Sequence, residues 1–283
     1  MNSNLDFGIK DKVAIVAGGG AIGLDIGNGR AASILLADAG VKVIVADKDE
    51  ELANNTVQMI KSRGGEAISI GGDLTKSDQC KKVIDFALNN WGRLDILNNN
   101  IGIASKLSVV EETEEDWNKI MEVNLKPTFL MSKYAIPAMI NTGDGGSIVN
   151  ISSISATRPK GLTSYSASKG AVLSLSQAMA VDNGADGIRV NCILPGPVYT
   201  PMVYSSGMTD QHRSQRQNAS LVQIEGDGWD IGKAVVYLSS NWARYITGHL
   251  LVDVHYHQSQ EAKLWFGNRR EYYPIFNRIH NLN

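Results

Sequence analysis

The chain has 283 residues, of which 43% are hydrophobic and 20% are charged, and its formal net charge is −2. This composition is typical of one large α/β globular domain, and the small net charge gives no electrostatic basis for binding nucleic acid or an anionic membrane. The chain holds 2 cysteines, has a polar N-terminus and contains no apolar run long enough to span a bilayer. We therefore expect a cytoplasmic protein with reduced thiols and without nucleic-acid or membrane partners.

The first predicted elements form a βαβ unit. Residues 12–17 are an apolar run rich in β-branched side chains, which predicts a buried strand. A glycine-rich loop over 18–29 follows, then a helix from about Asn28 to Asp38, and then a second buried strand over 41–46. This order of elements is typical of a dinucleotide-binding fold.

The glycine loop fits a phosphate site in two alignments. The pattern G-x-G-x-x-G matches residues 18–23, but it leaves Gly27 and Gly29 inside the helix, each at a cost of about 1 kcal/mol relative to Ala. We favour the alignment in which the helix begins at Gly27, Asn28 and Gly29, where backbone N–H groups face a pyrophosphate, with Gly18 opening the loop. A plain glycine-rich turn is the alternative, which the flanking strand and helix disfavour.

Asp47 follows the second predicted strand, 18 residues after Gly29. This is close to the spacing of about 20 residues that separates the glycine loop from the ribose-binding acid in such folds. A carboxylate there accepts hydrogen bonds from ribose hydroxyls and repels a 2′-phosphate, so we expect NAD rather than NADP. Lys48 and Arg30 lie nearby and would weaken this preference.

Strands and helices continue to alternate along the chain. The expected elements are helices over 52–63, 76–91, 113–139 and 229–239, a helix beginning at Tyr165, and strands over 66–70, 94–97, 146–151, 188–193 and 250–254. The alternation predicts one doubly wound parallel sheet of Rossmann type, with about seven strands and helices on both faces. Ligands bind beyond the carboxyl ends of such strands, where Asp73 and Asn99 lie. Within the helix over 113–139, Asn124 and Pro127 predict a local kink.

Tyr165 lies four residues before Lys169, so both side chains share one face if the segment is helical. A nearby ammonium lowers the pKa of a phenol, which makes this pair a candidate proton-transfer device for an alcohol or ketone. The spacing is common, and an amphipathic surface pair is the alternative. The surroundings favour a catalytic role for the pair over a surface role, because Ser152 and Ser153 end the preceding strand at the same edge of the sheet.

The chain resembles the short-chain dehydrogenase/reductase family over about residues 8–253. The motifs that carry the resemblance occur in the family's order: the glycine loop, Asp73, Asn99-Asn100-x-Gly102, Asn124, Ser153, Tyr165-x-x-x-Lys169, and Pro195-Gly196 with Thr200. The family's catalytic set maps onto Asn124, Ser153, Tyr165 and Lys169. Ser152 is a weaker candidate for the serine, retained because the family usually has one more residue between its Ser and Tyr.

The resemblance implies a mechanism and further cofactor contacts. Tyr165 would exchange a proton with the substrate oxygen, Ser153 would hydrogen-bond that oxygen, and Lys169 would hold the nicotinamide ribose and depress the pKa of Tyr165. Asn124 would anchor a water that relays protons from Lys169 to solvent. The implied cofactor contacts, beside the glycine loop, Asp47, Tyr165 and Lys169, are Asp73, Leu74, Asn99, Gly102, Pro195, Gly196, Val198 and Thr200. The resemblance also implies a homo-oligomer, a tetramer or a dimer.

Four features depart from the family pattern. Ala17 stands where a Thr is usual, and the glycine loop carries about five extra residues within 19–26. Asn98 and Ile101 replace the usual Val and Ala around Asn99-Asn100. Val254-His255 follows Asp253 where a glycine pair is usual. None of these changes removes a catalytic group, although the longer loop leaves open which amides contact phosphate.

The substrate side of the site is expected to lie under a lid over residues 202–226, a polar segment for which a surface loop is the alternative. The candidate pocket wall is Ile154, Ser155, Leu162, Tyr199, Met202 and Tyr204. It lacks an Arg or Lys pair for a phosphate or dicarboxylate, so we expect a small neutral secondary alcohol or ketone as substrate. No catalytic metal is expected, because His249, His255 and His257 have no acid or Cys to complete a site.

Residues 1–254 are expected to form the oxidoreductase domain, and residues 255–283 an aromatic-rich extension that packs on protein rather than lying in solvent. The leading functional hypothesis is an NAD-dependent alcohol dehydrogenase or ketone reductase. A catalytically silent dinucleotide-binding sensor or scaffold is the alternative, supported by the altered glycine loop and disfavoured by the complete Asn-Ser-Tyr-Lys set. A dehydratase or epimerase on the same fold ranks third.

Overall fold

The structure is a computed structural model that describes residues 6–159, 161–205 and 207–252. Among these residues, 7 parallel strands form one sheet in the order β3-β2-β1-β4-β5-β6-β9. The strands are β1 (Val13–Ala17), β2 (Lys42–Asp47), β3 (Ala67–Gly71), β4 (Ile96–Asn99), β5 (Gly146–Ile151), β6 (Ile188–Leu194) and β9 (Leu250–Val252). The sheet confirms the predicted doubly wound α/β class.

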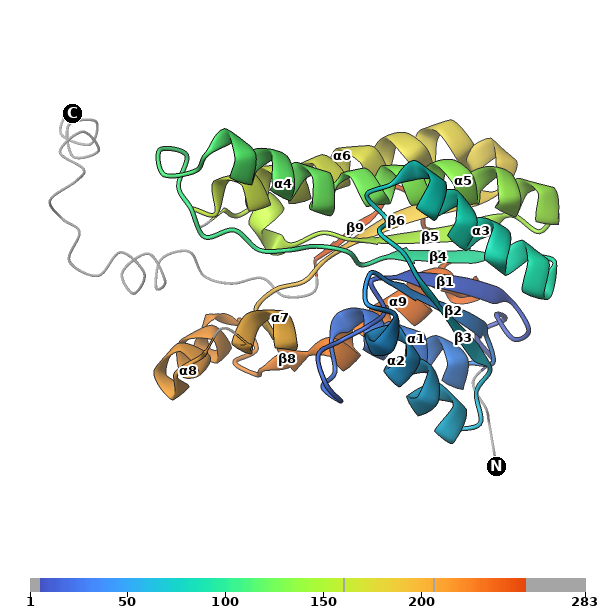
Figure 1. Ribbon diagram of the computed structural model, residues 1–283, viewed down its shortest axis with the longest axis horizontal. Coiled ribbons are helices and arrows are strands. Elements are labelled where there is room, and N and C mark those ends of the chain that lie inside the picture. The colour runs from blue at the N-terminus through green and yellow to red at the C-terminus, as the bar shows by residue number, and fades with distance from the viewer. Residues whose placement is uncertain (1–5, 160, 206, 253–283) are drawn as a thin grey trace, which may run out of the picture.

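Helices cover both faces of the sheet (Figure 1). One face carries α1 (Asn28–Asp38), α2 (Glu50–Ser62) and α9 (Gly228–Ser239), and the other carries α3 (Ser77–Trp91), α4 (Glu114–Asn124), α5 (Lys126–Thr142) and α6 (Thr163–Asn183). The central strand β1 is apolar along its whole length because it is buried between two helical layers, with five buried residues in succession. Within the described residues, no helix is long and apolar enough to cross a membrane.

Helix α9 packs closely on α1, the helix that follows the glycine loop. A Cβ added to Gly232 would lie 2.9 Å from the backbone carbon of Ala31, and one added to Gly228 would lie 3.0 Å from the carbonyl oxygen of Gly27. Side chains at these two positions would therefore push the helices apart. This contact holds the N-terminal end of α1 against α9.

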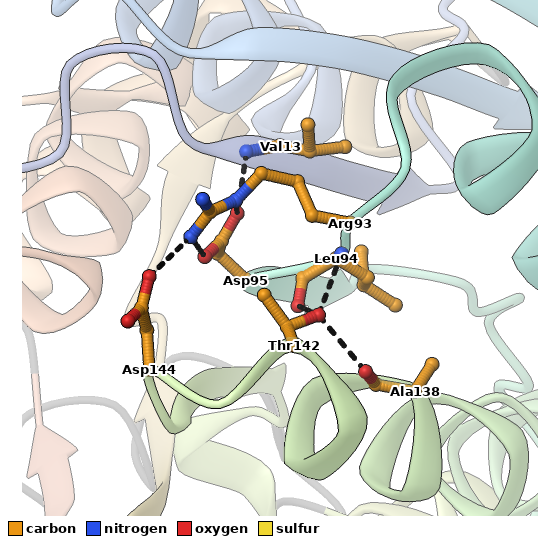
Figure 2. A network of polar contacts seen from close by, with 7 residues as sticks. All are labelled: Val13, Arg93, Leu94, Asp95, Ala138, Thr142 and Asp144. Carbon is orange, nitrogen blue, oxygen red and sulfur yellow. Dashed lines mark hydrogen bonds and ion pairs between the residues drawn. The ribbon is translucent and has the colours of Figure 1, made fainter.

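A buried ion pair joins β4 to β1 at the amino edge of the sheet (Figure 2). Asp95 accepts two hydrogen bonds from Arg93, at 2.8 and 2.6 Å, and a third from the backbone N–H of Val13 at 2.9 Å. Arg93 also contacts the exposed Asp144, which follows α5, at 2.6 Å. The Asp95 carboxylate thus fixes the start of one central strand against its neighbour.

The structure corrects the predicted helix over 113–139. It is two helices, α4 and α5, which break at Leu125, where φ is −110° and ψ is −49°. Leu125 keeps αR backbone angles, and its N–H donates to the carbonyl of Met121 at 3.1 Å, so the interruption is consistent with the local kink predicted from Asn124 and Pro127. The position of this interruption matters for the site because it makes Asn124, a predicted catalytic residue, the last residue of α4.

Smaller differences concern boundaries and one extra sheet. The strand predicted over 94–97 is Ile96–Asn99, and the helix expected to begin at Tyr165 begins at Thr163. In the lid, α7 (Pro201–Tyr204) and α8 (Asp210–Ala219) accompany an unforeseen two-stranded sheet of β7 (Val198–Tyr199) and β8 (Gly226–Asp227). The predicted end of the last strand, the predicted extension over 255–283 and two of the three histidines weighed as metal ligands lie outside the described residues.

Candidate active site

The serine pair at the end of β5 divides into two roles. The Ser152 hydroxyl donates to the carbonyl oxygen of Lys169 at 2.8 Å, so it faces the backbone of α6. Ser153 caps a short 3-10 turn by accepting from the N–H of Ser155 at 3.2 Å, and its side chain hydrogen-bonds Tyr165. The structure therefore brings Ser153, rather than Ser152, to the phenol.

Tyr165 lies in the first turn of α6, partly buried. Burial raises the pKa of the Tyr165 phenol, and the hydrogen bond from Ser153 opposes that shift. The sequence-based expectation was the opposite direction, driven by Lys169 four residues later. The ammonium of Lys169 does not act directly on the phenol here, because it is held elsewhere.

Lys169 is 3% exposed, and its ammonium donates to the carbonyl oxygen of Ile151 at 3.0 Å. Burial lowers the pKa of Lys169 to about 8, since a charged ammonium loses hydration there. Gly102 leaves room for this group: a Cβ at that position would lie 3.0 Å from the Nζ atom. The lysine is thus confined beneath the loop that follows β4, in a state that exchanges protons near neutral pH.

Asn124 is buried at the end of α4 and binds the loop that follows β4. Its side-chain oxygen accepts from the N–H of Ile103 at 2.7 Å, and its amide donates to the carbonyl of Ile103 at 3.0 Å. The same amide donates to Ser168 at 3.1 Å. Asn124 therefore joins α4, the loop after β4 and α6, where its partner Ser168 directly precedes Lys169.

A buried polar row behind this site was not anticipated. Asn99 donates to Asn150 at 2.9 Å, and Asn150 donates to Ser176 at 2.8 Å, which links β4, β5 and α6 through the core. The side-chain oxygens of Asn98 and Asn99 are buried without a hydrogen-bond partner within the described residues. Three consecutive Asn residues at the end of a strand were the available signal. Since the Asn99 side chain is directed into the core, any cofactor contact from Asn99 comes from its backbone.

Glu112 is a second residue that sequence reasoning missed. Its carboxylate accepts from the N–H of Ser164 at 3.0 Å and also from the Ser164 hydroxyl. Leu162, the residue before α6, offers no side-chain cap, so Glu112 supplies the acceptor that the start of the helix needs. Glu112 belongs to an acidic segment, residues 111–116, that leads into α4. The segment caps α4 through Thr113 and α6 through Glu112.

The glycine loop ends where the favoured alignment placed it. Helix α1 begins at Asn28, and Gly27 precedes it without a side-chain cap. A Cβ on Gly29 would clash with the carbonyl oxygen of Gly18, and Gly18 itself has a φ of 80°. The side-chain oxygen of Asn28 is buried without a hydrogen-bond partner among the described residues. Because Gly27 supplies no side-chain cap, the backbone N–H groups of the first turn of α1 are available to an acceptor such as a phosphate.

Asp47 is the last residue of β2 and faces the glycine loop. Its carboxylate accepts from the N–H of Gly20 at 2.9 Å, and a Cβ on Gly20 would lie 2.8 Å from the same oxygen. Further along the edge, Thr75 holds Asp73 with two hydrogen bonds that lower the pKa of Asp73, and the ammonium of Lys48 lies 3.7 Å away. The two predicted adenosine-side acids thus occupy neighbouring strand ends.

The other predicted cofactor and pocket residues lie along the same carboxyl edge. Leu74 is buried below the β3 edge, and the carbonyl of Pro195 accepts from Ile154 at 3.0 Å. Gly196 accepts from Val198 at 2.8 Å, and Thr200 precedes α7. Among the pocket candidates, Tyr199 and Tyr204 stack at 4.6 Å, Leu162 adopts a φ of 58° before α6, and Met202 is exposed.

A hollow of about 530 Å³ lies at the opposite, amino edge of the sheet. Its lining includes Lys12, Asp95, Arg189 and Tyr245, and none of the predicted site residues. Within the described residues, no group of three His, Cys, Asp or Glu side chains is arranged to hold a metal ion. The chemistry-bearing side chains gather at the carboxyl edge instead.

Comparisons with known proteins agree with this geometry. A family model described as enoyl-(acyl carrier protein) reductase matches residues 23–256. A 2,5-dichloro-2,5-cyclohexadiene-1,4-diol dehydrogenase of Sphingobium indicum is 37% identical over 238 residues, covering 84% of this chain and 92% of that protein. A short-chain dehydrogenase/reductase of Aspergillus oryzae is 34% identical over 249 residues, with coverages of 86% and 93%. A crystal structure described as a short-chain dehydrogenase/reductase from Burkholderia xenovorans has a TM-score of 0.83 at 35% identity, covering 86% of this chain and 95% of that one.

Proposed function

The chain belongs to the short-chain dehydrogenase/reductase family of oxidoreductases, and from that premise we propose that it transfers a hydride between NAD and a small neutral secondary alcohol or ketone. The observation that carries the proposal is the interaction of the Ser153 side chain with the Tyr165 phenol, with Lys169 one turn further along α6 and its buried ammonium held by the carbonyl of Ile151. A binding module has no need of this arrangement, which disfavours the sensor or scaffold alternative.

The residues at the start of α1 fit a dinucleotide. Gly18 and Gly29 approach each other too closely for any side chain, and Gly27 leaves the first turn uncapped. The backbone N–H groups there would hold the pyrophosphate. Asp47 would accept from the ribose hydroxyls, and its carboxylate favours NAD over NADP. The other proposed contacts are Asn28, Asp73, Leu74, Asn99, Gly102, Pro195, Gly196, Val198 and Thr200.

The nicotinamide, when bound, supplies the hydride chemistry. Tyr165 would exchange the proton at the substrate oxygen, and Ser153 would hydrogen-bond the same oxygen. The raised pKa of Tyr165 keeps the phenol protonated, which suits donation to a ketone. A cationic neighbour would favour the phenolate needed for alcohol oxidation.

Lys169 and Asn124 would supply the proton path. With its pKa lowered to about 8, Lys169 can release and regain a proton near neutral pH, which an ordinary lysine cannot do. Asn124, the last residue of α4, hydrogen-bonds Ile103 in the loop after β4, the same loop that confines Lys169. We assign Lys169 to holding the nicotinamide ribose and passing protons outward.

The surroundings of the lid favour a neutral substrate. The guanidinium of Arg213, which lies 4.0 Å from the Tyr199 ring, is paired with both carboxylate oxygens of Glu225. The positive charge of Arg213 is therefore already compensated. The dehydrogenase of Sphingobium indicum is named for a cyclic diol, which supports a cyclic secondary alcohol as one substrate for this chain.

A homo-oligomer in the cytoplasm, a tetramer or a dimer, is part of the proposal. Helices α4, α5 and α6 expose large apolar side chains, of which Trp117, Phe129 and Val181 are 38%, 48% and 83% exposed. Exposed apolar groups on neighbouring helices are typical of a subunit contact. Light scattering on the purified protein would measure the mass, and a monomer at micromolar concentration would contradict this part.

The test is a fluorescence titration with NADH and NADPH, followed by a screen of alcohols, on the wild-type protein and the Tyr165→Phe variant. We expect NADH to bind more tightly than NADPH to both proteins. The variant should lose about 1,000-fold in turnover, the contribution of a positioned acid or base. Equal turnover in both proteins would refute the role of Tyr165, and saturable activity only on phosphorylated or acyl-thioester substrates would refute the substrate class. Dinucleotide binding without turnover of any substrate would favour the silent protein.

A further inference from the structure

The extra residues of the glycine loop are anchored to the body of the domain. Arg30 is 0% exposed, and its guanidinium donates to the carbonyls of Ala21, Gly23 and Asp25 at 2.8, 2.9 and 2.6 Å. Arg30 also donates to Thr56 of α2 at 2.9 Å. Burial lowers the pKa of Arg30, yet five donors in a fixed fork match the carbonyls that surround it. The extra residues of the loop are therefore held in one defined conformation by hydrogen bonds.

The tip of this extension touches the lid. The hydroxyl of Tyr204, the last residue of α7, donates to the carboxylate of Asp25 at 2.8 Å. The Tyr204 ring stacks on Tyr199, and Arg213 of α8 lies over the Tyr199 ring at 4.0 Å. Arg213 is paired in turn with Glu225. One continuous set of contacts thus runs from the cofactor loop across the described lid segments.

The hydrogen bond between Asp25 and Tyr204 persists across the physiological range. Partial burial and the Asp25 carboxylate raise the pKa of Tyr204 to about 12, so the phenol remains a donor at neutral and mildly alkaline pH. A phenol that donates to a carboxylate forms a charge-assisted bond, stronger than one between neutral groups. Only one such bond joins the loop extension to α7 among the described residues.

We propose that Asp25 and Tyr204 form a latch that makes the extended glycine loop and the substrate lid open and close together. The inference rests on the proposed function, because the loop is then the wall of the NAD site and the lid the roof over the substrate. Asp25 and Tyr204 are positioning residues, since neither is assigned to the reacting atoms. Cofactor release and lid opening would then be coupled, because both would require breaking the hydrogen bond between Asp25 and Tyr204.

Hydrogen–deuterium exchange on the cofactor-free protein tests the latch without any dependence on activity. The variants are Asp25→Ala, which removes the acceptor, Tyr204→Phe, which removes the donor, and the double variant. The matched control is Asp186→Ala, since Asp186 is exposed, lies between two residues that line the hollow at the opposite edge of the sheet, and makes no side-chain hydrogen bond within the described ranges. We expect amides of α7 and α8 to exchange about 3- to 10-fold faster in each single variant, the effect of losing one hydrogen bond. The double variant should match the singles, because the same bond is lost.

NADH release gives the second readout. Stopped-flow dissociation should be about 3- to 10-fold faster in both single variants and no faster in the double variant, again the scale of one hydrogen bond. Unchanged exchange of α7 and α8 in Asp25→Ala, or effects that add in the double variant, would overturn the latch. If the wild-type protein bound neither NADH nor NADPH, the proposed function would fail, while the exchange experiment would still decide whether the latch exists.

Discussion

Lys169 is the residue at which function and stability conflict most clearly. Its pKa is about 8 in the folded chain against a reference value of 10.5. The folded state therefore binds the proton less tightly than the unfolded state, and the ammonium destabilises the fold at every pH below about 8. This penalty disappears as the pH rises from 8 to 10.5. The difference between the two pKa values corresponds to about 3 kcal/mol.

Replacing Lys169 by Met should consequently stabilise the protein and inactivate it. Near neutral pH we expect a gain of about 1–2 kcal/mol, less than the full penalty because the carbonyl of Ile151 loses its donor. The gain should vanish toward pH 10, where the wild-type lysine is neutral in the fold. Urea unfolding at both pH values measures it, with the exposed Lys119→Met as the control. A gain in stability that is independent of pH would show that the buried ammonium charge of Lys169 does not destabilise the fold.

At the scale of elements, the strands are positioned by a few polar side chains as well as by apolar packing. Asp95 and Asp144 share the same partner, Arg93, in very different surroundings (Figure 2). The Asp95 side chain is 1% exposed and also accepts from Val13, whereas Asp144 is 59% exposed. A buried charge that loses its partner is costly, while an exposed pair contributes little.

We therefore expect Asp95→Ala and Asp144→Ala to differ sharply. Loss of the Asp95 carboxylate leaves the N–H of Val13 and the guanidinium of Arg93 without their buried acceptor, at a cost of about 3 kcal/mol. Loss of Asp144 should cost under about 1 kcal/mol. Denaturant unfolding of both variants makes the comparison. Equal losses would mean that the pair does not fix β4 against β1.

At the scale of the whole molecule, hydrophobic patterning was sufficient to predict the architecture. Helix α1 and strand β5 have the predicted bounds, because caps, glycines and apolar runs coincide at their ends. The interruption at Leu125 is consistent with the predicted kink, since Pro127 cannot donate a backbone hydrogen bond to the preceding turn. The sheet of β7 and β8 was missed, because two-residue strands carry no periodicity.

For the candidate site, the spacing of Tyr165 and Lys169 follows from local order along the chain, and the choice of Ser153 follows from the family resemblance. The electrostatics of these residues were less predictable. The raised pKa of Tyr165 and the hydrogen bond from Lys169 to Ile151 depend on burial, which only the packed fold determines. Arg30 was expected to act near Asp47 but is buried with its guanidinium on the carbonyls of the glycine loop, and Glu112 was missed; both act on backbone groups brought close by tertiary structure.

The most direct test of the proposed function is deuterium transfer from a secondary alcohol labelled at its carbinol carbon. Purified wild-type protein and Tyr165→Phe would be incubated with NAD and a panel of neutral cyclic and acyclic alcohols, and the nucleotide analysed by mass spectrometry. We predict deuterated NADH from at least one alcohol with the wild-type protein and almost none with the variant. Absence of labelled NADH across the panel, from a protein that binds NADH tightly, would contradict the account and favour a dinucleotide-binding protein without catalysis.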